Sequence, residues 1–448
     1  MAQSSNSSFF SLEELTKLKS GFDRHDVENV KQLIQMKLDD LDNTELNIAV
    51  TGETGTGKST FINAMREIRH GDEGAAETGT IETTMEPIGY QHPVLPNVSF
   101  WDLPGIGTTK FPADKYLKKM EFKRYDFFII ILACRFTEND VKLVKEIKRL
   151  GKNFYCIRCN IDNDLNSMRN VTRKFTEEEE LAKIRNDCVS KLNMAGIPTP
   201  NVFLISNFHL NLYDFNLLNE SLEDDLPNVK KSVYILALPT LNLEIIEKKR
   251  NELKERIWMM ATLSGVMGAV PVPGVSLGCD IGIVIKKIIL FRKCMGLDDA
   301  SLQRLANIVG KPVEDLKVVV KTPLAGKITP GIIEKMQWGY AALAISAVEI
   351  TLDFIPVVGS LFGAGSSFVM TYKLLSFALD ELAENARRVV TAALETHESD
   401  LGQRLIQKDK AAIDMLKGSN PAGILFCSVL FLLISFLAIF FIHSREGV

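Results

Sequence analysis

Short apolar runs recur through the first half of the chain, each followed by a polar turn. Four of them are rich in β-branched or aromatic residues: Ile48–Val50, Val98–Asp102, Phe154–Arg158 and Val202–Ile205. Runs of this length and composition predict buried strands. Strands in this order indicate an α/β fold with a doubly wound sheet, which binds its ligand at the carboxyl ends of the strands.

The second half of the chain contains two long apolar segments, Met259–Leu290 and Ala341–Leu375. Each is interrupted by a similar turn, VPVPGV at Val270–Val275 and IPVVGS at Ile355–Ser360. Pro and Gly within apolar runs predict helical hairpins. The preceding segment, Asn242–Trp258, has apolar and charged residues at helical spacing and predicts a further helix.

These hairpins allow two interpretations. Asp280 and Asp353 lie inside the apolar segments, and Met259–Val270 has only 12 residues, whereas a membrane-spanning helix needs ~20. We favour packing within a helical bundle, and shallow insertion into a membrane is the alternative.

The C-terminal segment Pro421–Ile442 contains 22 residues without a charge. A helix of that length rises ~33 Å, which is enough to cross a hydrocarbon core of ~30 Å. We predict a single-pass transmembrane tail anchor at 421–442, with a buried terminal helix as the alternative. Lys408, Lys410 and Lys417 precede it and favour the cytosolic face of an intracellular membrane for the rest of the chain. The segment Asp380–Leu416 is amphipathic and predicts a solvated helix.

The composition is that of a folded protein without an affinity for polyanions. Over 448 residues, 46% are hydrophobic and 24% are charged, which is typical of globular chains. Lys and Arg number 52 against 56 Asp and Glu, a formal net charge of −4. No global positive field attracts nucleic acid, so we expect no nucleic-acid partner.

A phosphate-binding motif follows the first predicted strand. Gly52–Ser59 reads GETGTGKS, which is G-x-x-x-x-G-K-S, and a helical segment follows it. The glycines let backbone N–H groups surround a phosphate, and the Lys58 ammonium neutralises its outer oxygens. The Ser59 hydroxyl is a ligand for Mg²⁺ at the start of the helix.

The second predicted strand ends in Asp102-Leu103-Pro104-Gly105, a D-x-x-G pattern. Asp102 is expected to hold Mg²⁺ through water, and the Gly105 N–H to meet the γ-phosphate, so that the following loop senses it. Ile106 stands where small signalling GTPases carry a Gln that orients water. Intrinsic hydrolysis should therefore be slow or use another residue.

Base selection is expected from two later turns. Cys159-Asn160-Ile161-Asp162 takes the position of the N/T-K-x-D motif of GTPases, and a carboxylate at Asp162 pairs with guanine N1 and N2 but faces acceptors on adenine. Asn160 replaces the Lys that packs along the base, which weakens that contact. Ser206 and Asn207 end the last predicted strand, where a loop closes over the guanine.

A polar stretch between the first two motifs supplies a further Mg²⁺ ligand. It offers four threonines and the Glu82 carboxylate, which could orient water. The residues by themselves leave open which threonine binds Mg²⁺: Thr78, Thr80, Thr83 or Thr84.

The chain resembles the interferon-inducible, immunity-related GTPases. The resemblance is carried over roughly residues 10 to 310 by these stretches: GETGTGKST, EGAAETG, ETTMEPIGY, NVSFWDLPGIGT, KYLKKMEFKRYDFFII, FLISN, YDF at Tyr213–Phe215, IEKKRNELKERIW and SLQRLA. It implies a P-loop G domain inserted into an all-α helical domain built from both chain ends. With the tail, the expected parts are an N-terminal helical segment 1–42, a G domain 43–220, a helical domain 221–420 and the anchor 421–442.

The resemblance also implies a function. Lys58 places the chain with the Lys-bearing, effector-like members. These are dynamin-like in that GTP drives self-assembly through the nucleotide faces and contact promotes hydrolysis. The assembly acts on vacuole, endoplasmic reticulum or Golgi membranes, in cell-autonomous defence or in the remodelling of organelle membranes. In the matching switch stretch, the Mg²⁺-facing threonine falls on Thr78 and the hydrolysis-assisting glutamate on Glu82.

The leading hypothesis is a membrane-anchored, Mg²⁺-dependent GTPase that binds GTP and GDP and forms homo-oligomers. Its catalytic residues are Glu82, Lys58 and Thr78, and its metal ligands are Ser59, Thr78 and Asp102. A slowly hydrolysing, GTP-switched membrane scaffold is the second hypothesis, and an ATPase motor, disfavoured by Asp162, is the third. The candidate nucleotide-binding residues are Glu53, Thr54, Gly55, Thr56, Gly57, Lys58, Ser59, Thr60, Thr78, Asp102, Gly105, Asn160, Asp162, Ser206 and Asn207.

Overall fold

The computed structural model describes residues 10, 12–24, 26–78, 86–104, 120–132, 138–171, 175–194, 196–197, 201–210, 212–268, 278–326, 328–329, 331–332 and 366–417. Contacts between residues divide the chain into two compact units, 1–390 and 391–448. Within the described residues, the second unit contains only the end of helix α16 (Ser366–Lys417).

The first unit contains a mixed sheet with strand order β2-β3-β1-β4-β5-β6. Among the described strands, β2 pairs antiparallel with β3, and the other pairs are parallel. The strand runs expected from the sequence are present, and two further strands complete the sheet. The strands are β1 (Leu46–Gly52), β2 (Ile88–Gln91), β3 (Val98–Asp102), β4 (Phe127–Ile131), β5 (Asn153–Arg158) and β6 (Val202–Leu204).

Helices cover both faces of this sheet, as a parallel sheet with buried strands requires. Every residue of β4 is buried, because its side chains alternate between two apolar layers. On one face, Phe128 packs in a core cluster with residues of α5, α6 and α7. On the other face, the rings of Phe127 and Tyr234 of α9 meet edge to face with centroids 6.4 Å apart. The covering helices are α3 (Lys58–Met65), α5 (Glu138–Arg149), α6 (Ile161–Val171), α7 (Glu177–Met194), α8 (Phe215–Asp225) and α9 (Asn228–Ala237).

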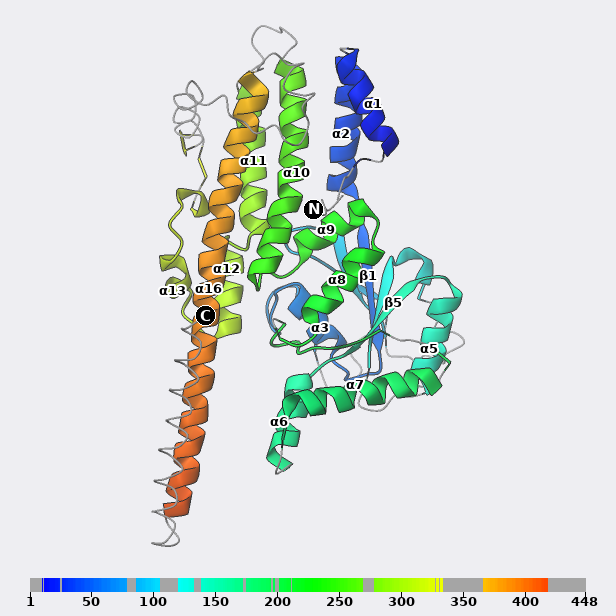
Figure 1. Cartoon of the computed structure of the whole chain (residues 1–448), viewed down its shortest axis with the longest axis vertical. Coiled ribbons are helices and arrows are strands. Elements are labelled where there is room, and N and C mark those ends of the chain that lie inside the picture. Colours follow the sequence, from blue (N-terminus) through cyan, green and yellow to red (C-terminus); the bar gives the residue numbers. More distant parts are fainter. Residues whose placement is uncertain are drawn as a thin grey trace, which may run out of the picture. The chain divides into compact units, whose positions relative to one another are not determined.

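Helices from both ends of the first unit form an α-helical part beside the sheet (Figure 1). The N-terminal helix α2 packs against α10, and their shared core includes Ile34, Met259 and Phe368 from three distant segments. Helical segments far apart in the sequence thus share one apolar core, and the expected separate helical domain stays a prediction. The elements of the α-helical part are α1 (Leu12–Asp23), α2 (Val27–Asn43), α10 (Leu243–Gly268), α11 (Gly278–Cys294), α12 (Asp299–Val309), α13 (Val313–Val318) and the part of α16 before residue 391. Two short 3₁₀ turns, η1 (Phe122–Arg124) and η2 (Pro323–Ala325), connect elements of the unit.

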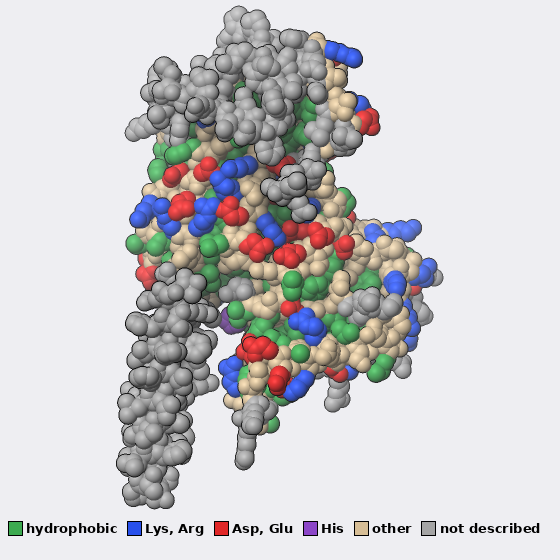
Figure 2. Space-filling view, in the orientation of Figure 1, with side chains coloured by type: hydrophobic (Ala, Val, Ile, Leu, Met, Phe, Trp, Pro, Cys, Tyr) green, Lys and Arg blue, Asp and Glu red, His purple; other side chains and the backbone are tan. Residues whose placement is uncertain are grey.

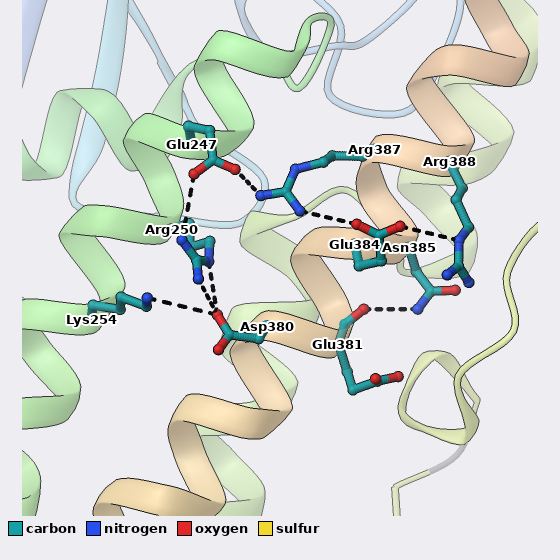
Figure 3. Close-up of polar contacts among 9 residues, drawn as sticks. All are labelled: Glu247, Arg250, Lys254, Asp380, Glu381, Glu384, Asn385, Arg387 and Arg388. Carbon is teal, nitrogen blue, oxygen red and sulfur yellow. Dashed lines mark hydrogen bonds and ion pairs between the residues drawn. The ribbon is translucent and has the colours of Figure 1, made fainter. Parts of the chain in front are cut away.

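Ion pairs between α10 and α16 lie outside that apolar core (Figure 3). The Arg250 guanidinium reaches Asp380 at 2.7 Å, and Arg387 pairs with both Glu247 and, at 3.0 Å, Glu384. These side chains are part-exposed, so each pair contributes about 1 kcal/mol or less to stability. On the face drawn in Figure 2, acidic and basic side chains are likewise interspersed along one band.

Several expectations from the sequence fall partly or wholly outside the described residues. The first hairpin is represented by α10 and α11, but its turn at 270–275 is not described. The second turn at 355–360 and the expected tail anchor at 421–442 also lie outside the described residues. Within the part that is described, no helix has the length and apolar character needed to cross a membrane. The expected boundaries at 42, 220 and 420 stay predictions.

A buried histidine makes the fold sensitive to acid. His92 follows β2, and its Nδ1 accepts hydrogen bonds from the backbone N–H of Val94 and Leu95 at 3.3 and 3.2 Å. Burial, with smaller contributions from the charges of Lys249, Arg66 and Arg304, lowers the pKa of His92 to about 3. The ring is therefore neutral in the folded protein at all but strongly acid pH.

We expect the free energy of unfolding to fall as the pH drops from 7 to 5. His92 takes a proton in the unfolded chain below its ordinary pKa of 6.5 but not in the folded one, which amounts to a loss of about 2 kcal/mol at pH 5. Urea unfolding at both pH values measures this loss, with His92→Gln as the comparison. Equal losses in the wild type and the variant would contradict the assignment to His92.

Candidate nucleotide-binding site

The phosphate-binding motif forms a loop between β1 and α3. The Glu53 carbonyl accepts hydrogen bonds from the Thr56 hydroxyl and the Lys58 ammonium, both at 2.9 Å, so the loop closes on itself. Lys58 is buried at the first position of α3. Thr54 and Gly55 are exposed at the tip of the loop. The amino end of α3 and the Lys58 charge together favour an anion at this position.

Two glycines of this loop are required by the backbone. Gly52 has φ +141°, and a Cβ there would lie 2.3 Å from the backbone oxygen of Ile131 in β4. Gly57 caps α3 in the left-handed region with φ +97°, and a Cβ there would lie 3.2 Å from Nδ2 of Asn207. The sheet and the base-side loop thus both approach the phosphate loop as closely as glycine permits.

The structure brings the expected Mg²⁺ ligands Ser59 and Asp102 together. Ser59 lies in the first turn of α3 and Asp102 at the end of β3, and the hydroxyl donates to Asp102 Oδ2 at 2.6 Å. Thr60, expected to bind the nucleotide and not the ion, is half-buried in the same turn. An alcohol and a carboxylate are oxygen ligands of the kind Mg²⁺ prefers, with the remaining positions left to water and phosphate. These residues therefore fit the ion that the motif implies.

The residues expected to contact the guanine base lie next to the phosphate loop. Asn160 stands before α6 with a left-handed φ of +61°, and Asp162 lies in the first turn of that helix. Asn207 donates from Nδ2 to the Gly57 carbonyl at 3.3 Å. The Ser206 hydroxyl accepts from the backbone N–H groups of the next two residues at 3.3 and 3.2 Å, which orders the turn after β6.

Two buried oxygens of this region have no hydrogen-bond partner among the described residues: Oδ1 of Asp162 and Oδ1 of Asn207. An unpaired acceptor costs about 1–3 kcal/mol when it is buried, so a ligand that donates hydrogen bonds is favoured here.

Cys159, which precedes Asn160, contacts the Asn207 side chain. Burial raises the pKa of the Cys159 thiol to about 12, so the thiol is protonated at neutral pH.

Thr78, the third expected Mg²⁺ ligand, contacts His70, whereas Ser59 and Asp102 contact each other. Its Oγ1 lies 2.7 Å from Nδ1 of the exposed His70. Glu82 and Gly105 lie outside the described residues.

Sequence reasoning missed the side chains that hold the segment before Thr78. Asn63 of α3 contacts Ala76, and Arg66, the residue after the helix, contacts Gly74. A polar Asn63 within the apolar stretch Phe61–Met65 was the available signal, but its partner lies 13 residues away in the sequence.

The comparisons with known proteins agree with this geometry. A family model described as interferon-inducible GTPase (IIGP) matches residues 11–393. The chain belongs to the interferon-inducible GTPase family. It is 40% identical over 391 residues to interferon-inducible GTPase 5 of Rattus norvegicus, covering 86% of this chain and 84% of the relative. It is 43% identical over 293 residues to interferon-inducible GTPase 1 of Mus musculus, covering 65% of this chain and 71% of the relative.

Among solved structures, Era of Aquifex aeolicus bound to GDP·AlF4− is similar over 40% of this chain and 56% of its own, at 18% identity and a TM-score of 0.29. That likeness is too slight to add to the assignment. Membership of the interferon-inducible GTPases establishes a GTPase that binds guanine nucleotide.

Gly52→Ala should lower the free energy of unfolding by more than 2 kcal/mol, on the order of a severe core substitution, because the methyl group meets the Ile131 carbonyl. Gly151→Ala is the matched control. Gly151 also has a positive φ, +65°, but a Cβ there has nothing within 4 Å, so only the backbone cost of about 1 kcal/mol applies. Urea unfolding measures both, and equal losses would show that the contact with Ile131 does not matter.

Proposed function

We propose that this interferon-inducible GTPase is a Mg²⁺-dependent GTP hydrolase that self-assembles on an intracellular membrane in cell-autonomous defence. The single observation that carries guanine selection is the buried, unpaired Oδ1 of Asp162. Guanine offers two N–H donors to such a carboxylate, whereas adenine presents acceptors to it. The contact between Asn207 and Gly57 supports one ligand spanning both loops.

The phosphates would be bound by the N–H groups of residues 53–60 and by the Lys58 ammonium. Ser59, Asp102 and Thr78 would hold Mg²⁺, which when bound neutralises charge that develops on the phosphates during hydrolysis. Thr78 would exchange His70 for the ion. The Gly105 N–H would sense the γ-phosphate, as the D-x-x-G pattern suggests.

Hydrolysis is proposed to depend on a second copy of the chain. Ile106 follows Gly105 in the sequence, and an aliphatic side chain cannot orient water. Glu82 would position the water instead, once contact between two nucleotide faces closes the site. The resemblance to effector-like members, noted from the motifs, supports this proposal.

The proposed location is the cytosolic face of an endoplasmic reticulum, Golgi or vacuole membrane. The uncharged segment at 421–442 supports it through its length, and the preceding lysines support the orientation.

Asp162→Asn should change the preferred base. We expect GTP affinity to fall by about 100-fold and affinity for xanthosine triphosphate to rise, because the amide donates to the xanthine O2 where the carboxylate accepted from guanine N2. Calorimetric titration with GTP, ATP and xanthosine triphosphate measures this. Asp164→Asn is the control, since Asp164 lies in the same helical turn but pairs with Arg158 at 2.6 Å. Unchanged GTP affinity in Asp162→Asn would refute guanine selection by this residue.

Phosphate release per molecule should rise with protein concentration, because the catalytic arrangement is complete only between two copies. Multiple-turnover assays over a 100-fold range of concentration, on the order of 0.1 to 10 μM where weak self-association is sensitive, test this. Glu82→Ala should abolish the rise while GTP binding persists. A flat specific activity would contradict assembly-dependent hydrolysis, and a single burst without turnover would support the GTP-switched scaffold instead.

A further inference from the structure

Asn63 makes a two-way contact with the backbone that precedes Thr78. Its Nδ2 donates to the Ala76 carbonyl at 2.8 Å, and its Oδ1 accepts from the Ala76 N–H at 2.7 Å. Both residues are buried, with 4% and 0% of their surfaces exposed. The two bonds fix the peptide groups on both sides of Ala76 to the side of α3, because one planar amide pairs with both.

Arg66, which caps the carboxyl end of α3, reinforces this attachment. Its guanidinium donates from Nη1 to the Gly74 carbonyl at 2.9 Å and from Nε to the Gln91 carbonyl at 3.0 Å, and it is 5% exposed. Asn63 and the residue that caps α3 therefore both hold the 74–76 segment, and Arg66 also holds the end of strand β2.

The same helix supplies the phosphate and ion ligands at its amino end, Lys58 and Ser59. Thr78, the third ion ligand under the proposed function, is only two residues beyond Ala76. We infer that Asn63 is a positioning residue for the Mg²⁺ site: it registers the start of the switch segment to α3, so that Thr78 reaches the ion bound by Ser59 and Asp102. This inference rests on the proposed function.

Under the proposed function, Thr78 leaves His70 to bind the ion, and this change explains why the attachment of Ala76 to Asn63 matters. The Thr78 hydroxyl contacts His70 Nδ1 at 2.7 Å, so the ion has to compete with this contact. With Ala76 attached to α3, the exchange needs rearrangement of a very short stretch of backbone. Without that attachment, the residues before Thr78 also have to be ordered each time the ion binds. Each ordered residue then lowers the affinity for the ion through lost conformational entropy.

If Asn63 had only a structural role, the Mg²⁺ requirement would not depend on it. A buried amide that only satisfies two backbone groups affects the free energy of unfolding but not the Mg²⁺ requirement of the folded protein. Asn385 provides the matched control. It lies on α16, where its Oδ1 accepts from the Lys321 N–H and its Nδ2 donates to the Glu381 carbonyl, both at 2.7 Å (Figure 3 shows the second bond). Its burial, with 1% exposed, is comparable.

The test compares Asn63→Ala and Asn385→Ala in the full chain. The readout is the Mg²⁺ concentration that half-maximally slows release of a fluorescent GTP analogue. We expect this concentration to rise about 10- to 100-fold in Asn63→Ala, as for residues that orient metal ligands, and to stay unchanged in Asn385→Ala. Affinity for the analogue in EDTA should be unchanged in both. A normal Mg²⁺ requirement in folded Asn63→Ala, or equal shifts in both variants, would overturn the inference.

Asn63→Asp keeps the test decisive if Asn63→Ala does not fold. The carboxylate still accepts from the Ala76 N–H but cannot donate to the Ala76 carbonyl, so we expect about a tenfold rise in the Mg²⁺ requirement. A requirement equal to that of the wild type would again overturn the inference. Failure of the wild type to bind the GTP analogue would instead refute the proposed function, so the two failures are distinguishable.

Discussion

The pairing of β1 between β3 and β4 is the constraint on which the nucleotide site depends. Val50 aligns with Asp102 on one side and Gly52 with Ile131 on the other. Parallel pairing brings the carboxyl ends of these strands to one edge of the sheet, where a doubly wound fold binds its ligand. The Asp102 carboxylate consequently meets Ser59, the second residue of the helix that follows β1.

Helix α3 connects this edge to the rest of the first unit. Its amino end carries Lys58 and Ser59, and its side holds the 74–76 segment through Asn63. Glu67, just after its carboxyl end, accepts a hydrogen bond from the Thr240 N–H at 2.9 Å, where the chain leads into α10. The buried Lys249 ammonium then donates to the Thr240 hydroxyl at 2.7 Å. One short helix and the residues directly after it therefore contact the phosphate loop, the segment before Thr78 and the stretch that leads into α10.

The local parts of the site could be predicted from the sequence. The phosphate loop joins a strand to a helix within a few residues, so its glycines, Lys58 and Ser59 are specified by neighbours in the chain. Asp102 and Asp162 could also be placed, since each follows an apolar run that predicts a strand. The antiparallel pairing of β2 and the hydroxyl contact of Thr78 with His70 were not predicted, because both depend on side chains or strands brought together by folding.

The sequence alone established a nucleotide-binding α/β domain with helices after it, because glycine spacing and apolar periodicity are properties of adjacent residues. The tertiary structure was needed to show that Asn63 binds Ala76, that Glu67 binds Thr240 across 173 positions, and that N-terminal and C-terminal helices share one core. Such contacts follow from how strands and helices pack in three dimensions. No local pattern records them, since many partners of the same polarity are available to each side chain along the chain.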